Sequence, residues 1–118
     1  MHDGKIIKNR VYRNGGGVYL EGSNTSFNMK KGTISDNHMA VMQVSASNST
    51  KTDGKGIGIY AGQNTKLQNG TGEGERSYVM ISANRGYRAS GIGVYSETDL
   101  VINKATIADN YSQSESYK

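Results

Sequence analysis

The chain has 118 residues, which suits one domain, and a formal net charge of +4. Hydrophobic residues make up only 34%, but glycine is abundant (16 residues) and proline is absent, which favours short strands and tight polar turns over a disordered linker. Cysteine is absent, which excludes disulfides and thiolate metal sites, and no apolar run approaches the roughly 20 residues of a membrane span.

Four segments of the chain end on asparagine and align with one another: GKIIKN, GTISDN, VMISAN and ATIADN. Each carries an isoleucine three places before its asparagine. Asparagine tolerates the left-handed backbone region at a tight turn, and stacked amides can hydrogen-bond from repeat to repeat. We therefore predict a structural ladder of these four residues, Asn9, Asn37, Asn84 and Asn110.

A second strand follows a glycine-rich turn in each repeat, in the segments GGGVYL, GIGIYA and GIGVYS. Apolar residues alternate there with the period of a strand, so the tyrosines should point outward. A third strand is expected around Phe27 and Met29, and again around Leu67 and Leu100. No segment keeps a helical apolar period, so no substantial helix is predicted.

The predicted organisation is a single domain over residues 1–118 with two inserted loops. The loops, 38–55 and 68–77, are rich in Gly, Ser, Thr and Asn, and residues 111–118 form a polar tail. One repeat cannot bury its apolar face alone, because its strands are too short to enclose a core. Stacked repeats predict a parallel β-solenoid with inward columns of Ile, Val and Leu.

The segments GGGVYL, FNMKKGTISDN, GIGVY and ATIADN resemble the repeats of right-handed parallel β-helix proteins. That family includes pectate-lyase-like domains and bacterial surface adhesins. The resemblance covers residues 4–37 and 56–110. It implies an all-β, right-handed parallel β-helix of about four rungs, with about three short strands per rung.

Candidate catalytic residues are few. Asp36 and Asp109 each directly precede an asparagine of the aligned segments, two repeats apart. Two strand spacings would separate them by about 9.6 Å. This distance is near the upper limit of the carboxylate separation in inverting glycosidases. Aspartate at this place is also ordinary turn chemistry. Lyases that the chain resembles use Arg or Lys to take a proton beside the carboxylate of an acidic sugar, which implies Arg88 as a further candidate. Basic residues also flank other asparagines, at Lys8, Arg10 and Arg85.

Metal and cofactor chemistry has no support in the sequence. His2 and His38 are the only histidines, and neither has an evident Ser, Asp or Glu partner in sequence. No Asp/Glu cluster has calcium spacing, and no phosphate-binding loop occurs. We predict no catalytic constellation, no metal site and no cofactor.

The tyrosine column is the main candidate for ligand binding. Stacked outward on one face, Tyr19, Tyr60 and Tyr95 could contact sugar rings or unpaired bases. Alternatively, they stabilise the sheet by cross-strand contact, worth about 0.2–1 kcal/mol per pair.

The residues and the resemblance favour a structural or binding module of an adhesin-like surface or carbohydrate-associated protein. Its partner would be an acidic glycan or a protein, and scattered Lys and Arg do not favour nucleic acid. An extracellular or cell-surface setting, bacterial or phage, is expected, although MHDGKIIKNR is not a signal peptide. Exposed apolar ends predict end-to-end self-association. The alternatives are a polysaccharide lyase or hydrolase segment, and a small phage or mobile-element protein that blocks a host protein.

Overall fold

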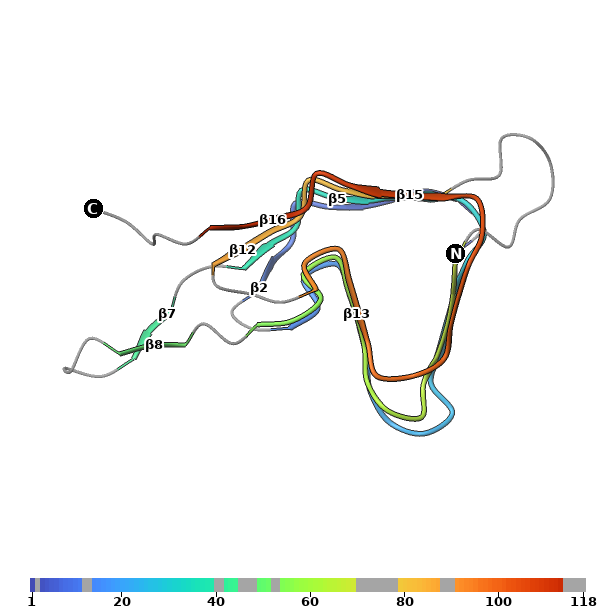
Figure 1. The fold of residues 1–118 in the computed structure, drawn as a ribbon, viewed down its shortest axis with the longest axis horizontal. Coiled ribbons are helices and arrows are strands. Elements are labelled where there is room, and N and C mark those ends of the chain that lie inside the picture. The colour runs from blue at the N-terminus through green and yellow to red at the C-terminus, as the bar shows by residue number, and fades with distance from the viewer. Residues whose placement is uncertain are drawn as a thin grey trace.

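The computed structural model describes residues 1, 3–11, 14–39, 42–44, 49–51, 54–69, 79–87 and 91–113. Within these ranges the chain forms strands and no helix. Four sheets of parallel strands run through the molecule. In Figure 1, segments from successive repeats overlie one another along much of the chain. The architecture is therefore all-β, with stacked parallel sheets that are consistent with a parallel β-solenoid.

The first sheet carries the isoleucine column. It contains β1 (Lys5–Ile7), β5 (Gly32–Ser35), β11 (Val79–Ser82) and β15 (Ala105–Ala108), in that order. The register places the isoleucines of the four aligned segments opposite one another. Ile34 and Ile81 are fully buried. The predicted alignment of these segments is thus confirmed.

The two other predicted strand sets form three-stranded parallel sheets. One contains β3 (Val18–Leu20), β9 (Ile59–Ala61) and β13 (Val94–Ser96), and the other β4 (Ser26–Met29), β10 (Lys66–Asn69) and β14 (Leu100–Ile102). Together with the first sheet they enclose the main core. Its fully or nearly fully buried members are Leu20, Met29, Ile34, Ile59, Ala61, Leu67, Val79 and Ile81.

A fourth parallel sheet corrects the prediction of three strands per repeat. It contains β2 (Arg10–Val11), β6 (His38–Met39), β12 (Arg85–Tyr87) and β16 (Tyr111–Gln113). Each of these strands follows an asparagine directly and begins with a polar or aromatic residue. Strands this short show no apolar alternation, so the sequence pattern could not reveal them.

Several strands fall within the segments predicted as loops and tail. The segment 38–55 begins with β6 and continues into an antiparallel pair, β7 (Met42–Val44) and β8 (Ser49–Lys51). Figure 1 shows this pair projecting away from the stacked sheets. The segment 68–77 begins within β10, and its residues 70–77 lie outside the described ranges. The tail 111–118 begins with β16.

Candidate functional site

A row of asparagine side chains lies at the bend between the first and fourth sheets. Asn9 Nδ2 donates to Asn37 Oδ1 at 2.9 Å, Asn37 Nδ2 to Asn84 Oδ1 at 2.9 Å, and Asn84 Nδ2 to Asn110 Oδ1 at 2.8 Å. The backbone N–H groups of the first three donate to the same oxygens. Asn37 and Asn84 are completely buried. These hydrogen bonds are compatible with the predicted ladder.

The left-handed backbone position at this bend is the residue before each asparagine, not the asparagine itself. The φ angles are 60° at Lys8, 55° at Asp36, 53° at Ala83 and 57° at Asp109. The expectation that asparagine adopts this conformation was therefore wrong. Asparagine occupies the next position because its amide can reach inward to the neighbouring amides and to backbone carbonyls.

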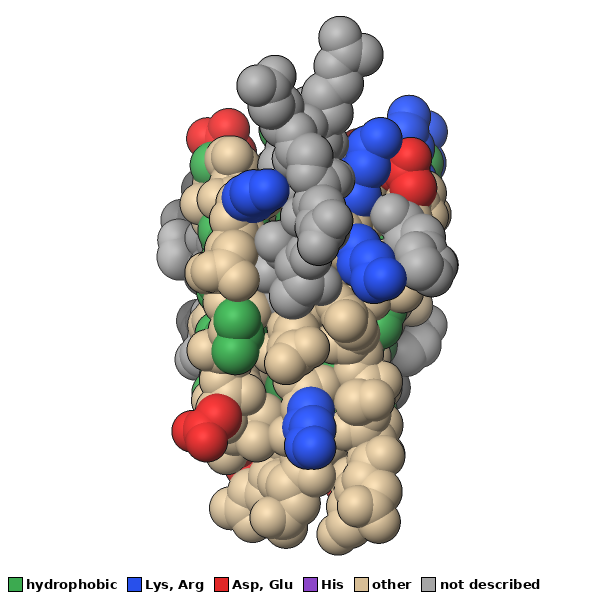
Figure 2. Space-filling model, turned by 90° about the vertical axis from the view of Figure 1, so that its right-hand side faces the viewer, with side chains coloured by type: hydrophobic (Ala, Val, Ile, Leu, Met, Phe, Trp, Pro, Cys, Tyr) green, Lys and Arg blue, Asp and Glu red, His purple; other side chains and the backbone are tan. Residues whose placement is uncertain are grey.

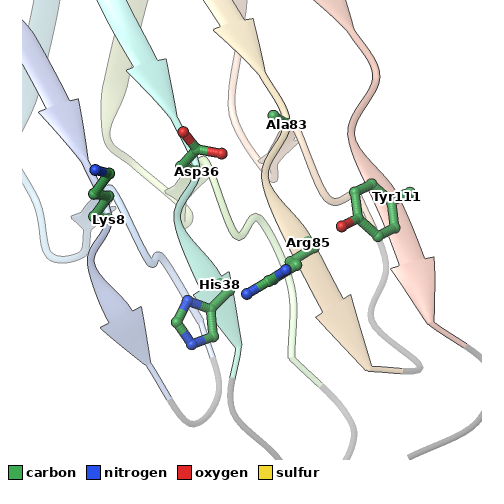
Figure 3. Close-up of a pocket in the computed structure, with 6 residues that line it drawn as sticks. All are labelled: Lys8, Asp36, His38, Ala83, Arg85 and Tyr111. Carbon is green, nitrogen blue, oxygen red and sulfur yellow. The ribbon is translucent and has the colours of Figure 1, made fainter.

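Residues on both sides of the buried asparagines line a hollow on the outside of the bend (Figure 3). It has a volume of about 370 Å³. Three of its residues come from the left-handed column and three from the column that begins the fourth sheet. We call it the basic hollow; it is lined by Lys8, Asp36, His38, Ala83, Arg85 and Tyr111.

The charge of the basic hollow is predominantly positive. His38 lies opposite Arg10 on one side and Arg85 on the other. Partial burial, followed by repulsion from Arg85 and Arg10, lowers the pKa of His38 below its usual value. Within the described parts of the chain, no ion pair joins Asp36 to Lys8 or Arg85. Cationic groups therefore gather here without a carboxylate paired to each of them.

The predicted tyrosine column forms a stack of rings along the sheet of β3, β9 and β13. The centroids of Tyr19 and Tyr60 are 4.9 Å apart with planes inclined by 10°, and those of Tyr60 and Tyr95 are 5.5 Å apart with planes inclined by 6°. Both faces of the Tyr60 ring are therefore covered by neighbouring tyrosines. A sugar ring cannot stack on Tyr60 without opening the column, so the arrangement favours the stabilising role.

The hydroxyl groups of the outer tyrosines contact carboxylates. Tyr19 donates to Glu21 Oε2 at 3.0 Å and Tyr95 to Glu97 Oε1 at 3.1 Å. Partial burial, and next the charge of Glu97, raise the pKa of Tyr60 above its usual value. Lys55 also contacts this column, with its Nζ 3.4 Å from the Tyr95 hydroxyl and 4.9 Å from the centre of the Tyr95 ring, so both charge signs are present around the tyrosines. The ligand-binding role of Tyr19, Tyr60 and Tyr95 stays a prediction.

The other predicted site residues divide into three groups. Asp36 lines the basic hollow, whereas Asp109, in the same left-handed column, is not among its lining residues. Lys8 and Arg85, noted in the sequence for their places beside asparagines, meet there. Arg88 and His2 lie outside the described residues.

Sequence reasoning missed two residues of the hollow, His38 and Tyr111. Both directly follow an asparagine of the aligned segments, in the same column as Arg10 and Arg85. That common place after the asparagine is the signal that could have found them. Histidine suggests triads and zinc sites first, and His38 has no partner for either in sequence.

Basic side chains are more dispersed elsewhere. Figure 2, which views the right-hand side of Figure 1, shows single Lys and Arg side chains among uncharged surface, and several at its upper right beside an acidic side chain. Among the residues that the structure describes, no group of three or more His, Cys, Asp and Glu side chains could hold a metal ion. Nor does the described chain contain a helix of the length and apolarity that crossing a bilayer requires.

Comparison with known proteins adds no relative. No protein-family model matches the chain, and no match was found among curated proteins or solved structures.

Proposed function

We propose that this chain is a small right-handed parallel β-helix of about four rungs that binds an acidic glycan in its basic hollow. The stacked parallel sheets and the repeat resemblance support the fold. One observation carries the function: Lys8 and Arg85 line one hollow on the outside of a bend, and Arg10 lies beside its His38. The adhesin-like, extracellular bacterial or phage setting rests on the resemblance and belongs to the same proposal.

The chemistry of the hollow suits a carboxylate or sulfate group on a sugar. An arginine guanidinium presents a planar pair of donors that matches either anion, and a lysine adds a point charge. These groups project from a stacked sheet held by buried amides, so little backbone entropy is lost on binding. Tyr111 and His38 supply further polar contacts at the walls.

Replacing Arg85 should weaken binding of a sulfated oligosaccharide. We expect Arg85→Gln to raise the dissociation constant by about tenfold, because a charge-assisted hydrogen bond contributes about 1.5–3 kcal/mol. Isothermal titration calorimetry at fixed salt concentration measures this change. Lys66 is exposed on β10 and lies outside the hollow; Lys66→Gln removes the same charge and should change affinity less than about twofold. Equal losses in both variants would show non-specific attraction and contradict the site.

Binding should strengthen as the pH falls. The pKa of His38 is lowered, so this side chain is mainly neutral at pH 7 and gains its charge as the pH falls. A bound anion favours the protonated form, so affinity for a sulfated oligosaccharide should rise several-fold between about pH 8 and about pH 5. His38→Gln should abolish most of this rise. If the variant keeps the full pH dependence, His38 does not face the anion.

A second candidate function is a polysaccharide lyase that acts at the same hollow. The observation that favours it is a neutral His38, able to accept a proton, between arginines that would neutralise the carboxylate of the sugar. Such an enzyme releases unsaturated sugar ends that absorb ultraviolet light. Their release from acidic glycans, lost in His38→Gln and retained in Lys66→Gln, would establish this activity. Binding without release would leave the binding module as the function.

A further inference from the structure

The two ends of the stacked sheets differ in how well their apolar residues are covered. At the end formed by β14 and β15, Leu100, Ile102 and Ile107 are 37%, 39% and 43% exposed. At the opposite end, formed by β1 and β4, Ile6 and Phe27 are only partly exposed and pack against the core. Exposed strand edges with apolar side chains favour pairing with another chain.

The asparagine row also has unlike ends. Each Oδ1 inside the row accepts from the N–H and the Nδ2 of the preceding asparagine. Within the described chain, Asn9 Oδ1 accepts no hydrogen bond, while the backbone N–H of Asn110 donates none. One end therefore offers an acceptor and the other offers donors, at equivalent places in the repeat. Two such ends are complementary.

If two copies stack end to end, apolar residues of one copy face apolar residues of the other, and opposite charges face each other. If β1 of a second copy lay beside β15, Ile107 would meet Ile6 of that copy, and Asn110 would meet its Asn9. In the left-handed column, Asp109 would meet a lysine, Lys8. In the column that begins the fourth sheet, Tyr111 would meet an arginine, Arg10.

The sheet that contains β4 supports the same spacing. Met1 extends the edge of this sheet, because its amino group donates to Asn28 O at 2.6 Å and Lys30 N donates to Met1 O at 2.8 Å. Met1 thus lies beside Met29, in the column that ends at Ile102. In the stacked pair, exposed Ile102 would meet Met1 of the second copy. The first sheet, the fourth sheet and the column of Met29 and Ile102 therefore all allow the same alignment of the second copy.

We propose that the end formed by β14 and β15 binds the β1 end of a second copy of this chain, head to tail. The contact joins Asn110 to Asn9, Ile107 to Ile6 and Asp109 to Lys8, and it continues the first and fourth sheets from one copy into the next. The sheet of β3, β9 and β13 leaves one strand position open at each junction. Because the two surfaces differ, the contact is heterologous and can repeat into chains of copies.

Two end-blocking variants of the full chain test this arrangement. Ile6→Arg blocks one end and Ile107→Arg blocks the other. By light scattering, we expect the mass of the unmodified protein to increase with concentration and each variant alone to stay monomeric. An equimolar mixture of the two variants should form a dimer, because one intact end of each kind is then present. Circular dichroism confirms that both variants are folded.

A charge exchange gives a second test with exposed residues only. Asp109→Lys places a lysine opposite Lys8 and should reduce association about fivefold or more. Adding Lys8→Asp to the same chain restores opposite charges and should restore association. A monomer at every concentration would overturn the proposal, as would dimers formed by Ile6→Arg or Ile107→Arg alone, since those need contact between like ends. Neither result depends on glycan binding, so the proposed function is tested separately.

Discussion

Asn84→Ala should lower the free energy of unfolding by about 4 kcal/mol. The Oδ1 of this buried side chain accepts from the Asn37 N–H at 3.1 Å and from Asn37 Nδ2 at 2.9 Å. Its Nδ2 donates to Ile34 O at 3.1 Å and to Asn110 Oδ1 at 2.8 Å. Alanine removes all four hydrogen bonds and leaves the donors of completely buried Asn37 without these partners. Urea unfolding followed by circular dichroism measures the loss.

Asn9→Ala is the matched control, because it deletes the same amide at the exposed end of the row. Asn9 donates from its backbone and side chain to Asn37 Oδ1. Water can replace its side chain there, so we expect a loss of about 1 kcal/mol or less. Equal losses for Asn9→Ala and Asn84→Ala would mean that burial of the row contributes little.

The parts of the fold that sequence could predict are those repeated identically in every stacked strand. In a parallel stack, the register brings like residues together. Aligning Ile34 with Ile81, or Tyr19 with Tyr60, in the sequence therefore predicts that the two residues are neighbours in the sheet. Isoleucine and asparagine columns could therefore be assigned from the aligned repeats alone. The same logic placed the tyrosines in one column, on the face away from the apolar residues.

What sequence could not predict depends on local backbone geometry and on unlike residues in one column. The position with left-handed backbone, directly before each asparagine of the row, is occupied by lysine, aspartate or alanine, so it cannot be recognised from residue type. The column that begins the fourth sheet contains arginine, histidine and tyrosine, and only the bend brings it beside the left-handed column. The direction of the tyrosine rings depends on side-chain torsions, which repeats do not reveal.

Glycine lets a second backbone reach the asparagine row from the opposite side of the core. Gly17 N donates to Ile57 O at 3.0 Å, and Gly58 N to Ile92 O at 2.8 Å, so this strand entry is hydrogen-bonded between repeats. A Cβ at Gly17 would lie 3.1 Å from Asn37 Nδ2, and one at Gly93 would lie 2.8 Å from Asn110 Nδ2. A side chain larger than that of glycine would therefore collide with the buried asparagine amides at these positions.

Gly58→Ala should accordingly destabilise the fold by about 3 kcal/mol. An added Cβ would collide with the carbonyl oxygen of Gly93 and lie 3.0 Å from Asn84 Nδ2 and 3.1 Å from Ile81 Cγ2. The first neighbour is backbone and the other two are completely buried side chains, so none can move without breaking hydrogen bonds or core packing. Thermal and urea unfolding of the variant measure the loss.

Gly62→Ala separates this steric effect from the general cost of changing a glycine. Its added Cβ would approach Leu20 O at 3.3 Å, and the next nearest atoms belong to the Tyr60 ring and hydroxyl, at 3.5 and 3.8 Å. We expect a change within about 1 kcal/mol, of either sign, because alanine also restricts the unfolded chain. If Gly58→Ala were as mild, the backbone there could move away from Asn84, and the amide row would not require a glycine partner. A large loss at Gly58 alone would show that the close approach of this backbone to Gly93 and Asn84 requires a residue without a Cβ.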